Sequence, residues 1–586
     1  MSMTLAPFAP SRTTLLERLA QQVQASLLAD VGPAAVEAAV HPGLSAALGL
    51  PLREWTQTRR RMLAPGVPFD MAAHRYMQAI YEDRRREIVV MKSGQGGATE
   101  WLISYALHAC DVRHMNVLYL LPTVGDVSDF SQMRIGTALE ASEHLASLVV
   151  AGRDEGGKRG SDKVMLKRIR DRFLIMRGTQ VRTGDMAKER TRASQLKSVP
   201  ADAVVYDEFD EMAPNVEALA TMRLGHSPVR EQRFVSTPTY PGLGIHAKWL
   251  QSTQAEWFVP CPACGHKQPL TIQHVVTAWD ELERPVTWHG QEEGGAHAAC
   301  ERCGGELDRL AEGEWVEAQP GREMAGYHFS KLATAQTPVI EVVRRLQETS
   351  ADKRTQAYNQ DLGLPYKPHG SGLDDLVLDA CRREYAHGAH GKETCVMGVD
   401  VGRVLHVVVR CQISDDRQEA GERAQRWAGE VAGFDDLGPL MERFGVTRCV
   451  VDALPETRSA RLFQQAQPRG RVWLAYYSLN TQGTKDADPV RWNDDERTIE
   501  IDRTRLLDET VSRFMTNVNT LPGNIRALAT YYDHLKALVR TERQQPNGVT
   551  VAAYVQTGPD HYAHAENYCT AASLPHKPPR AGSWGR

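Results

Sequence analysis

Between residues 69 and 255, short apolar runs alternate with segments of helical spacing. The apolar runs are Ile88–Met91, Val117–Leu121, Phe173–Met176, Ala203–Tyr206 and Arg233–Ser236. Buried runs separated by helical crossovers are typical of a mostly parallel sheet covered on both faces. Each run ends in a short polar or glycine-bearing loop, at the edge where open α/β sheets bind ligands. We therefore expect an α/β domain with a binding site at that edge.

The same kind of pattern returns in the last third of the chain and predicts a second α/β unit. Its apolar runs are Cys395–Asp400, Leu405–Val409, Arg448–Asp452 and Arg471–Tyr476. Between the two units the residue composition changes. A segment rich in aromatic, proline and glycine residues comes first, and a segment with the apolar spacing of helices follows. The predicted segments are 1–55 (helical), 56–255 (first α/β domain), 256–320 (cysteine-bearing segment), 321–390 (helical linker), 391–572 (second α/β domain) and 573–586 (disordered tail).

The composition is that of a globular protein. Of 586 residues, 42% are hydrophobic and 24% charged, and no stretch approaches the roughly 20 continuous apolar residues of a membrane helix. The first residues lack the charged-then-apolar order of a signal peptide, so we expect a cytosolic chain without membrane contact. A net charge of −4 does not suit a protein that coats nucleic acid. Any DNA contact must use local clusters such as Arg84–Arg86, which are equally well explained as solvated helix faces.

A glycine-rich segment follows the first apolar run directly. It reads Lys92, Ser93, Gly94, Gln95, Gly96, Gly97, Ala98 and Thr99. Glycines let backbone N–H groups converge on phosphates, the following helix adds partial positive charge, and the Thr99 hydroxyl suits Mg²⁺. The usual phosphate-binding motif has a lysine where Ala98 stands, so Lys92 is the candidate cation for the β and γ phosphates of ATP. The alternative interpretation is a glycine-rich turn without a ligand.

Two further motifs favour the nucleotide hypothesis. The run Ala203–Tyr206 ends in Asp207 and Glu208. In ATPases with this pattern the first acid holds Mg²⁺ through water and the second polarises the attacking water. Ser236-Thr237-Pro238, at the end of another predicted strand, fits a motif that senses the γ-phosphate and couples it to motion. The alternative is a pair of acids that simply ends a strand.

Two CxxC pairs predict a zinc site. The pairs are Cys261 with Cys264 and Cys300 with Cys303, and a glycine that permits a tight turn follows each pair. Four thiolates suit a structural Zn²⁺ without an open coordination position. The long separation of the pairs implies an inserted hairpin in a zinc-ribbon-like segment. Four unrelated thiols are the alternative, and in a cytosolic chain this cysteine pattern argues against a disulfide framework.

Three aspartates in separate elements suggest a second metal centre. Asp400 and Asp452 each end an apolar run, and Asp560 stands far downstream, next to His561. Three carboxylates can hold two Mg²⁺ or Mn²⁺ ions about 4 Å apart, an arrangement that cleaves phosphodiesters. His561 either assists such a site or only forms a hydrogen bond. Each aspartate taken alone is most often a strand-end or helix-cap residue, and it is their order and context that favour a metal centre.

Together these motifs resemble the large terminase subunit of lambda-like tailed bacteriophages, from about residue 50 to 572. The resemblance extends to Val259–Gly265, to Asn359–Tyr366, and to Asp560 with Ala565 and Tyr568. The displaced lysine is common in that family. The resemblance implies a P-loop NTPase domain and a ribonuclease H-like nuclease domain, with the zinc-ribbon-like segment between them.

The resemblance also implies what the chain does and with what. It implies ATP-driven translocation of double-stranded phage DNA into the procapsid, and metal-dependent cutting of concatemeric DNA. ATP would bind through Lys92–Thr99 and Asp207, and the catalytic residues would be Glu208, Asp400, Asp452 and Asp560. The implied partners are the small terminase subunit at the N-terminal region and the portal protein at the tail. The implied setting is a homo-oligomeric ring in the host cytoplasm.

Two other functions remain open from the residues. One is a DNA-dependent ATPase or helicase-like motor without nuclease activity, although the chain has no arginine-bearing motif of the QxxGRxGR kind. The other is a zinc-stabilised DNA-binding scaffold in which Ala98 marks an inactive ATP site. A metal-dependent cleavage assay with and without ATP separates these functions.

Overall fold

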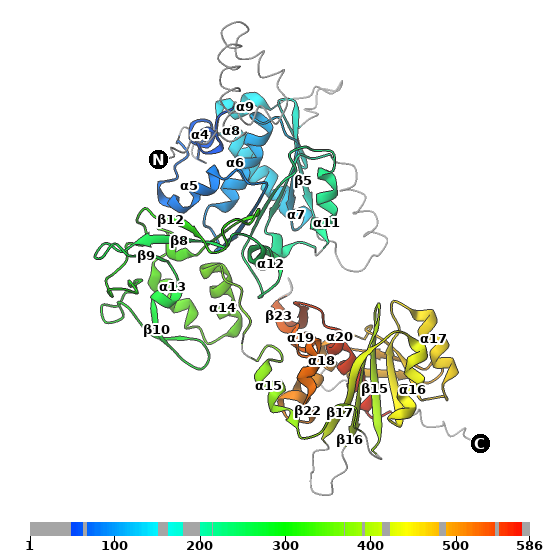
Figure 1. Cartoon of the computed structure of the whole chain (residues 1–586). Coiled ribbons are helices and arrows are strands. Elements are labelled where there is room, and N and C mark those ends of the chain that lie inside the picture. Colours follow the sequence, from blue (N-terminus) through cyan, green and yellow to red (C-terminus); the bar gives the residue numbers. More distant parts are fainter. Residues whose placement is uncertain are drawn as a thin grey trace, which may run out of the picture. The chain divides into compact units, whose positions relative to one another are not determined.

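The computed structural model describes residues 49–62, 67–149, 162–179, 200–213, 215–368, 370–389, 393–412, 422–479, 488–544 and 550–576. The chain divides into two compact units, residues 1–366 and 367–586 (Figure 1). Most of the expected helical N-terminal region and of the expected disordered tail lies outside the described residues. Within the described ranges, no helix combines the length and the apolar character needed to cross a membrane.

The first unit is built on a mostly parallel sheet, as predicted. Its strand order is β12, β8, β13, β1, β7, β6, β2, β5, β4 and β3, with β9 paired to β8. The central parallel strands are β13 (Ala325–Phe329), β1 (Glu87–Lys92), β7 (Glu231–Ser236), β6 (Ala203–Asp207), β2 (Val117–Leu121) and β5 (Arg172–Gly178). The outer strands are β12 (Glu314–Glu317), β8 (Ala255–Pro260), β9 (Lys267–Pro269), β4 (Leu166–Ile169) and β3 (Asp162–Lys163). Each apolar run predicted for this domain lies in a central strand.

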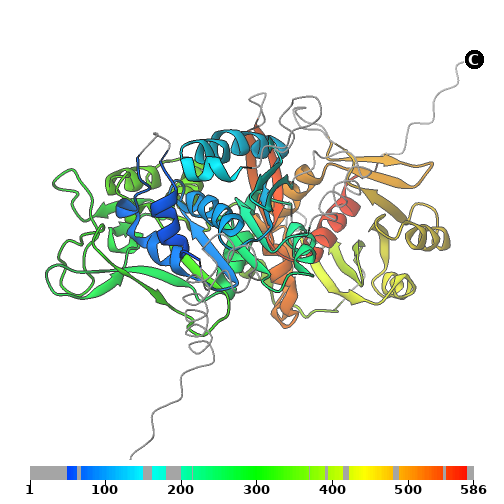
Figure 2. The same cartoon turned by 90° about the horizontal axis from the view of Figure 1, so that it is seen from above.

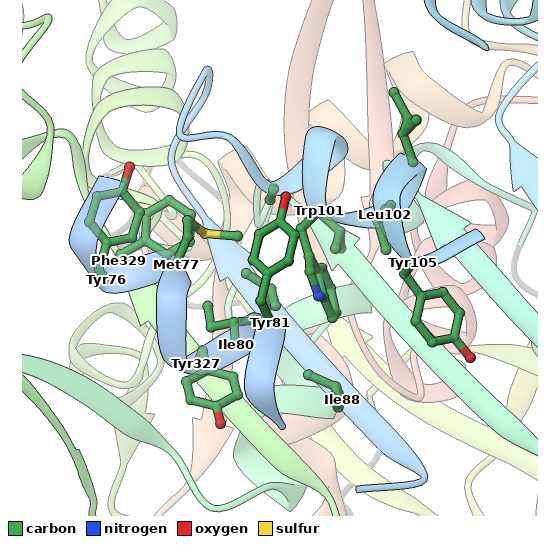
Figure 3. Packing of buried hydrophobic residues seen from close by; sticks show 14 of the residues in the cluster. Tyr76, Met77, Ile80, Tyr81, Ile88, Trp101, Leu102, Tyr105, Tyr327 and Phe329 are labelled. Atoms are coloured by element: carbon green, nitrogen blue, oxygen red, sulfur yellow. The ribbon is translucent and has the colours of Figure 1, made fainter. Parts of the chain in front are cut away.

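Both faces of this sheet are covered because its apolar residues alternate between them. Ile88 and Val90 pack into the larger cluster, whereas Val89 and Met91 pack into the opposite one. Helices on the larger face are α4 (Leu52–Arg59), α5 (Arg75–Glu82), α6 (Ala98–Asp111), α7 (Val124–Phe130), α8 (Thr137–Glu140) and α9 (Glu143–Leu148) (Figure 2). The other face carries α11 (Val216–Thr221) and α12 (Gly244–Gln251). Figure 3 shows Tyr81 and Trp101 packed between α5, α6 and β1.

The remaining segments of the first unit pack beside strands β8 and β13, at one end of the sheet. Between the two cysteine pairs lies an antiparallel hairpin of β10 (Val276–Trp279) and β11 (Pro285–Trp288). Helices α13 (Val339–Leu346) and α14 (Ala351–Gln356) follow, and a π-helix continues α14 from Ala357 to Leu362. Strand β13 lies inside the range that the pattern marks as a helical linker. It nevertheless pairs with β1 along its whole length, so the first compact unit extends to Tyr366.

The second unit contains a mixed sheet of ribonuclease H-like arrangement. Its strand order is β14, β22, β17, β16, β15, β18, β19, β21 and β20. The antiparallel strands β15 (Cys395–Val401), β16 (Leu405–Gln412) and β17 (Arg423–Val431) are followed on the other side of β15 by the parallel strands β18 (Val446–Asp452), β19 (Val472–Tyr476) and β21 (Thr498–Ile501). The remaining strands are β14 (Arg382–Arg383), β20 (Val490–Asn493), β22 (Asn519–Pro522), β23 (Leu538–Gln544) and β24 (Thr550–Gln556), the last two forming a separate hairpin.

Helices cover both faces of the second sheet. One face carries α16 (Leu437–Arg443) and α17 (Thr457–Ala466), and the other carries α15 (Asp375–Ala380), α18 (Arg503–Met515), α19 (Ala529–Lys536) and α20 (His561–Ser573). Helix α20 lies so close to β15 that a Cβ on Gly398 would overlap backbone atoms of Ala565 and Cys569. The buried Glu566 fixes the helix further, because the guanidinium of Arg410 donates to both its oxygens at 2.6 and 2.9 Å. These contacts set the position of the helix N-terminus.

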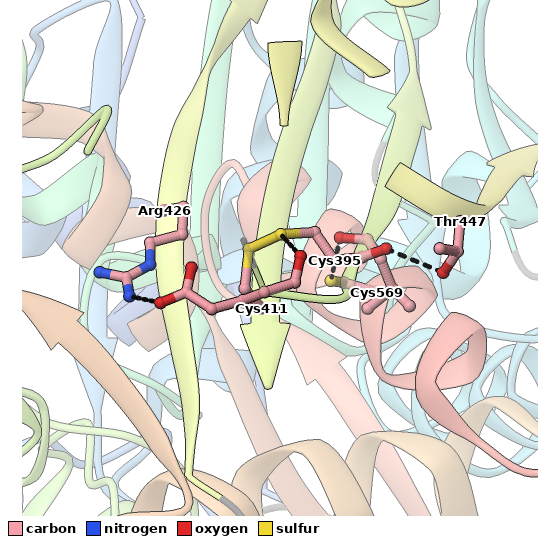
Figure 4. Close-up of a disulfide and its surroundings, with 7 residues drawn as sticks. Cys395, Cys411, Arg426, Thr447 and Cys569 are labelled. Carbon is pink, nitrogen blue, oxygen red and sulfur yellow. Dashed lines mark hydrogen bonds and ion pairs between the residues drawn. A yellow bond between two sulfur atoms is a disulfide. The ribbon is translucent and has the colours of Figure 1, made fainter. Parts of the chain in front are cut away.

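A disulfide joins Cys395 and Cys411 in this sheet (Figure 4). The two residues are directly opposite on β15 and β16. The cysteine spacing argues against disulfides, and the structure differs at this one pair. The reason is the strand register, which a spacing of sixteen residues does not reveal.

Candidate functional site

The glycine-rich segment joins the end of β1 to the start of α6, at the sheet edge expected for a ligand. Lys92 is the last residue of β1, and Ala98 is the first of α6. Gly97 caps the helix with a φ of +84°, a left-handed conformation that glycine adopts without strain. Gln95 is also left-handed, with a φ of +61°. The loop therefore presents the free N–H groups of a helix N-terminus beside Lys92 and Thr99.

The loop is held from behind by β13 and the π-helix. Ser93 N donates to Phe329 O at 3.0 Å, and Gly94 N donates to Gln360 O at 2.7 Å. A Cβ on Gly363 would lie 2.7 Å from the Lys92 carbonyl carbon. The sequence analysis gave Gln360 and Gly363 no role, although both lie in the segment Asn359–Tyr366 on which the resemblance rests. These residues fix the loop from a distant part of the chain.

The first acid of the predicted pair is buried at the end of β6. Thr99 Oγ1 lies 3.4 Å from Asp207 Oδ1, and the Tyr119 hydroxyl donates to Asp207 Oδ2 at 2.7 Å. Burial raises the pKa of Asp207 to about 6, and the neighbouring Glu208 carboxylate contributes to the rise. A carboxylate beside a threonine hydroxyl at a glycine-rich loop suits the Mg²⁺ of a nucleotide.

The second acid contacts the displaced lysine. Lys92 Nζ lies 2.8 Å from Glu208 Oε1, with the lysine side chain buried and the carboxylate partly exposed. Glu208 is left-handed, with a φ of +58°, a conformation that costs free energy for a residue with a Cβ. The structure thus brings Lys92, Thr99, Asp207 and Glu208 together. Lys92 points into the loop region and not into solvent.

The Ser236-Thr237-Pro238 segment follows β7 and links the acid pair to the π-helix. Asp210 N donates to Ser236 Oγ at 3.1 Å, and Gln360 Nε2 donates to Thr237 Oγ1 at 3.3 Å. The Asp210 carboxylate, which the sequence analysis missed, accepts from Thr239 N and Thr239 Oγ1 at 2.9 and 2.8 Å. Burial raises the pKa of Asp210 to about 6. Its position two residues after Glu208 was the only available signal.

The four predicted zinc ligands converge. The sulfur atoms of Cys261, Cys264, Cys300 and Cys303 all lie within 4.8 Å of one another. Gly265 and Gly304 have φ values of +70° and +72°, as the tight turns require. Burial opposes ionisation of Cys261, but backbone N–H groups and the neighbouring thiols lower its pKa to about 7. His266 pairs with Glu301 at 2.7 Å and is not among the converging ligands.

The predicted aspartates of the second unit lie around the N-terminus of α20. Asp400 and Asp452 are on the neighbouring parallel strands β15 and β18. Burial raises the pKa of Asp452 to about 6, and the Asp400 carboxylate contributes to the rise. Asp560 precedes α20 and lies 3.1 Å from His564 Nε2. Burial opposes its ionisation, but the hydrogen bond from His564 lowers the pKa of Asp560 below its ordinary value.

Histidines surround Asp400 as well. His561 Nδ1 lies 2.9 Å from Asp400 Oδ2, and this hydrogen bond raises the pKa of His561. His406 is directly opposite Asp400 on β16, and the sequence analysis missed it. Among the described residues, Asp400, His406 and His561 form a group whose ligand atoms could hold a metal ion. No sequence spacing signals His406, because the hairpin register alone brings it beside Asp400.

Comparison with known proteins relates the first unit to one protein family. Residues 72–318 match the model of the phage terminase large subunit gpA, ATPase domain. The crystal structure of the HK97 bacteriophage large terminase covers 89% of this chain and 99% of its own, with 8% identity and a TM-score of 0.50. Residues 72–318 are therefore similar to the ATPase domain of phage large terminase subunits, and the chain shares the fold of the HK97 protein.

Other terminase structures match parts of the chain. The ATPase domain of the Thermus phage P74-26 large terminase covers 51% of this chain and 94% of its own, at 10% identity and a TM-score of 0.30. The large terminase nuclease of the thermophilic phage G20c, with bound magnesium, covers 35% of this chain and 98% of its own, at 12% identity and a TM-score of 0.23. No curated protein matches the chain.

Proposed function

We propose that the first unit hydrolyses ATP and uses the free energy to move double-stranded DNA into a procapsid. The observation that carries this proposal is the convergence of Lys92, Thr99, Asp207 and Glu208 at one glycine-rich loop. Lys92 neutralises the β and γ phosphates, and loop N–H groups bind their oxygens. Thr99 and Asp207 fit the Mg²⁺ that accompanies the nucleotide. The 2.8 Å pair between Lys92 and Glu208 brings the lysine within reach of that place.

Glu208 is the proposed catalytic base, and the segment after β7 is the proposed coupling element. Phosphates compete with Glu208 for Lys92, so nucleotide binding frees the carboxylate to orient water. Thr237 shares a hydrogen bond with Gln360, whose carbonyl holds Gly94. A change at the γ-phosphate thus reaches Ser236-Thr237-Pro238 through the loop. These contacts support transmission from the loop to the sheet, whose motion would push DNA.

We propose that the second unit cuts DNA with divalent cations held by Asp400, Asp452 and Asp560. The three carboxylates fit hard cations such as Mg²⁺ or Mn²⁺. When bound, a pair of such cations supplies Lewis-acid stabilisation and an activated water for phosphodiester cleavage. The chain's own contribution is to hold the carboxylates on the rigid strands β15 and β18 and at the fixed start of α20. His564 orients Asp560 through its 3.1 Å contact.

Four convergent thiols fit a structural Zn²⁺, because soft ligands in a closed set leave no position for chemistry. We further propose the family's partners for this chain: the small terminase subunit, the portal protein and a homo-oligomeric ring in the host cytoplasm. Their support is the similarity of residues 72–318 to large terminase subunits, since the proposed contact segments lie outside the described residues.

A double dissociation tests the two activities. Glu208→Gln is expected to abolish DNA-stimulated ATP hydrolysis and DNA packaging while metal-dependent cutting persists. Asp400→Ala is expected to abolish metal-dependent cutting while DNA-stimulated ATP hydrolysis persists. Glu140→Gln and Asp435→Ala, both at exposed acids, are the matched controls. ATP hydrolysis that survives Glu208→Gln would refute the base assignment. Cutting that survives Asp400→Ala would leave the rival function, a motor without nuclease activity at this site.

The zinc proposal has its own measurement. Wild-type protein is expected to contain one tightly held zinc by elemental analysis, and Cys264→Ser is expected to lose it. The variant also loses several kcal/mol of stability in the first unit. His266→Ala is the control, since its exposed pair with Glu301 is worth at most about 1 kcal/mol. Equal zinc in wild-type and Cys264→Ser protein would show that the thiols do not hold it.

A further inference from the structure

Two histidines and a carboxylate converge in the second unit. The proposed cation ligands Asp400, Asp452 and Asp560 include neither histidine. Asp400 and His406 face each other across β15 and β16, and His561 begins α20. One oxygen of Asp400 and one ring nitrogen of each histidine lie within 4.8 Å of one another. The rings of His406 and His561 are stacked, with centroids 4.5 Å apart and planes at 16°. Ligand atoms of two chemical kinds are therefore gathered from three elements.

His406 is buried without satisfying its ring. The residue is 6% exposed, and its Nδ1 has no hydrogen-bond partner among the described residues. Its Nε2 lies 3.5 Å from Glu430 Oε1. Leaving a buried ring nitrogen unpaired costs free energy, so the arrangement calls for an explanation. A histidine that binds a metal commonly directs its second nitrogen to a carboxylate. Glu430 takes that outer position, and Nδ1 remains for the cation.

We propose that Asp400, His406 and His561 bind a divalent transition-metal cation, in preference to Mg²⁺, at a mixed carboxylate–imidazole site. The site shares Asp400 with the proposed nuclease centre and rests on that proposed function. Imidazole nitrogen is a good ligand for transition metals, whereas Mg²⁺ takes oxygen.

The distances fit one cation. Bonds of about 2.1 Å separate neighbouring ligand atoms by about 3 Å and opposite ones by about 4 Å. The 2.9 Å between Asp400 Oδ2 and His561 Nδ1 matches neighbouring ligands. In that geometry the cation replaces the proton that the two groups share. Because the two rings stack nearly parallel and imidazole binds a metal in its ring plane, binding of one cation requires at least one ring to rotate.

Mn²⁺ is the probe, because four thiolates bind it poorly and it leaves the cysteine cluster out of the measurement. The full chain without nucleotide is titrated with Mn²⁺, and pulsed electron paramagnetic resonance records nitrogen coupled to the bound ion. We expect coupling to imidazole nitrogen in wild-type protein. We expect His406→Gln to lose part of that coupling and to weaken Mn²⁺ binding about tenfold or more. Mg²⁺ affinity, measured by competition, should change much less.

His534→Gln is the matched control. The His534 ring lies 5.5 Å from both His406 and His561, but His534 is not in the converging group. Its variant should keep the nitrogen coupling and the Mn²⁺ affinity. Bound Mn²⁺ without nitrogen coupling in wild-type protein would overturn the proposal, and so would equal losses in the two variants. An absence of nitrogen coupling in the wild-type spectrum overturns the proposal even where a variant fails to fold.

The cutting assay keeps this proposal distinct from the nuclease proposal. If the protein cuts DNA in Mg²⁺ but shows no nitrogen coupling to Mn²⁺, the imidazole site is refuted and the nuclease proposal stands. Nitrogen coupling in protein that cuts DNA with neither metal supports the cation site and sinks the nuclease assignment.

Discussion

The two candidate sites solve the same electrostatic problem in opposite ways. Each has a buried aspartate at a strand end, Asp207 in the first unit and Asp452 in the second, and burial raises the pKa of each to about 6. Each also has a neighbouring carboxylate. In the first site Lys92 pairs with that neighbour, Glu208, at 2.8 Å. In the second, among the described residues, no lysine or arginine forms an ion pair with Asp400 or Asp452.

This difference says what each site needs from outside. The first site is balanced by its own lysine until an anion draws the lysine away, which suits a site that waits for a nucleotide. The second holds two carboxylates that, in the part of the chain that the structure describes, pair with no lysine or arginine, so its balance depends on a cation. A buried aspartate at a strand end can therefore belong to an anion site or to a cation site. The difference lies in the partner of the neighbouring carboxylate, which is Lys92 for Glu208 and His561 for Asp400.

Removing the lysine is the strongest way to break the contrast. Lys92→Ala leaves the loop without its cation, so we expect ATP hydrolysis to fall about 10³-fold. Metal-dependent DNA cutting in the absence of ATP should stay at the wild-type rate. Lys353→Ala, at an exposed lysine, is the control. The measurement is steady-state phosphate release beside a cleavage assay. A tenfold loss or less would mean that another cation serves the loop.

Divalent cations should act unequally on the two units when no nucleotide is present. At 100 times its dissociation constant, a cation stabilises its site by about 2.7 kcal/mol. We expect Mg²⁺ to protect β15 and the start of α20 from hydrogen exchange, with little change at β1 and α6. Asp452→Asn should remove most of that protection, and Asp435→Asn should not. Equal protection of both units would contradict the proposal that only the second site depends on a cation.

The fold and the contiguous motifs were within reach of the sequence. Apolar runs gave the central strands, and the loop Lys92–Thr99, the pair Asp207-Glu208 and the cysteine pairs have their chemistry on adjacent residues. Asp400 and Asp452 were reached because each ends such a run. In these cases local pattern and position in the sheet carry the same information.

What stayed out of reach depends on tertiary pairing. His406 reaches Asp400 only through the register of the β15–β16 hairpin. Gln360 and Gly363 reach the loop only because β13 joins the first sheet after the long cysteine-bearing segment. The Cys395–Cys411 disulfide follows from the same hairpin register. No spacing rule encodes such contacts, since the intervening chain can have any length.

A substitution at Gly363 tests the first site alone, because a Cβ there would clash with the backbone of the glycine-rich loop. Gly363 has a φ of +63°, and a Cβ there would lie 2.7 Å from backbone atoms of Lys92 and Ser93. Gly363→Ala should therefore displace the loop, cost about 2 kcal/mol of stability and reduce ATP hydrolysis about tenfold. Gly370→Ala, where the φ is also positive but nothing lies within 4 Å, separates strain from the clash. Equal losses in both variants would show that backbone strain alone acts.

The smallest effect concerns pH, and it tests whether the two buried aspartates are equivalent. The folded-state pKa of Asp452, about 6, lies above its unfolded value of 3.8, so between these values the folded state holds more protons. Stability should therefore fall as pH rises through this window, and the cost is complete above pH 6. Without metal at pH 7.5, Asp452→Asn should gain about 1–2 kcal/mol.

Asp207→Asn should gain about as much as Asp452→Asn, because the pKa of each aspartate is about 6, and the value for Asp207 already includes the effect of Lys92. Denaturant unfolding at pH 5 and pH 7.5, with chelator, measures both variants. The gain should shrink at pH 5, where both acids are largely protonated in the folded state. It should also vanish when Mg²⁺ is added, since only the aspartate binds the cation. A clearly larger gain for either variant would mean that the folded-state pKa values of the two aspartates differ.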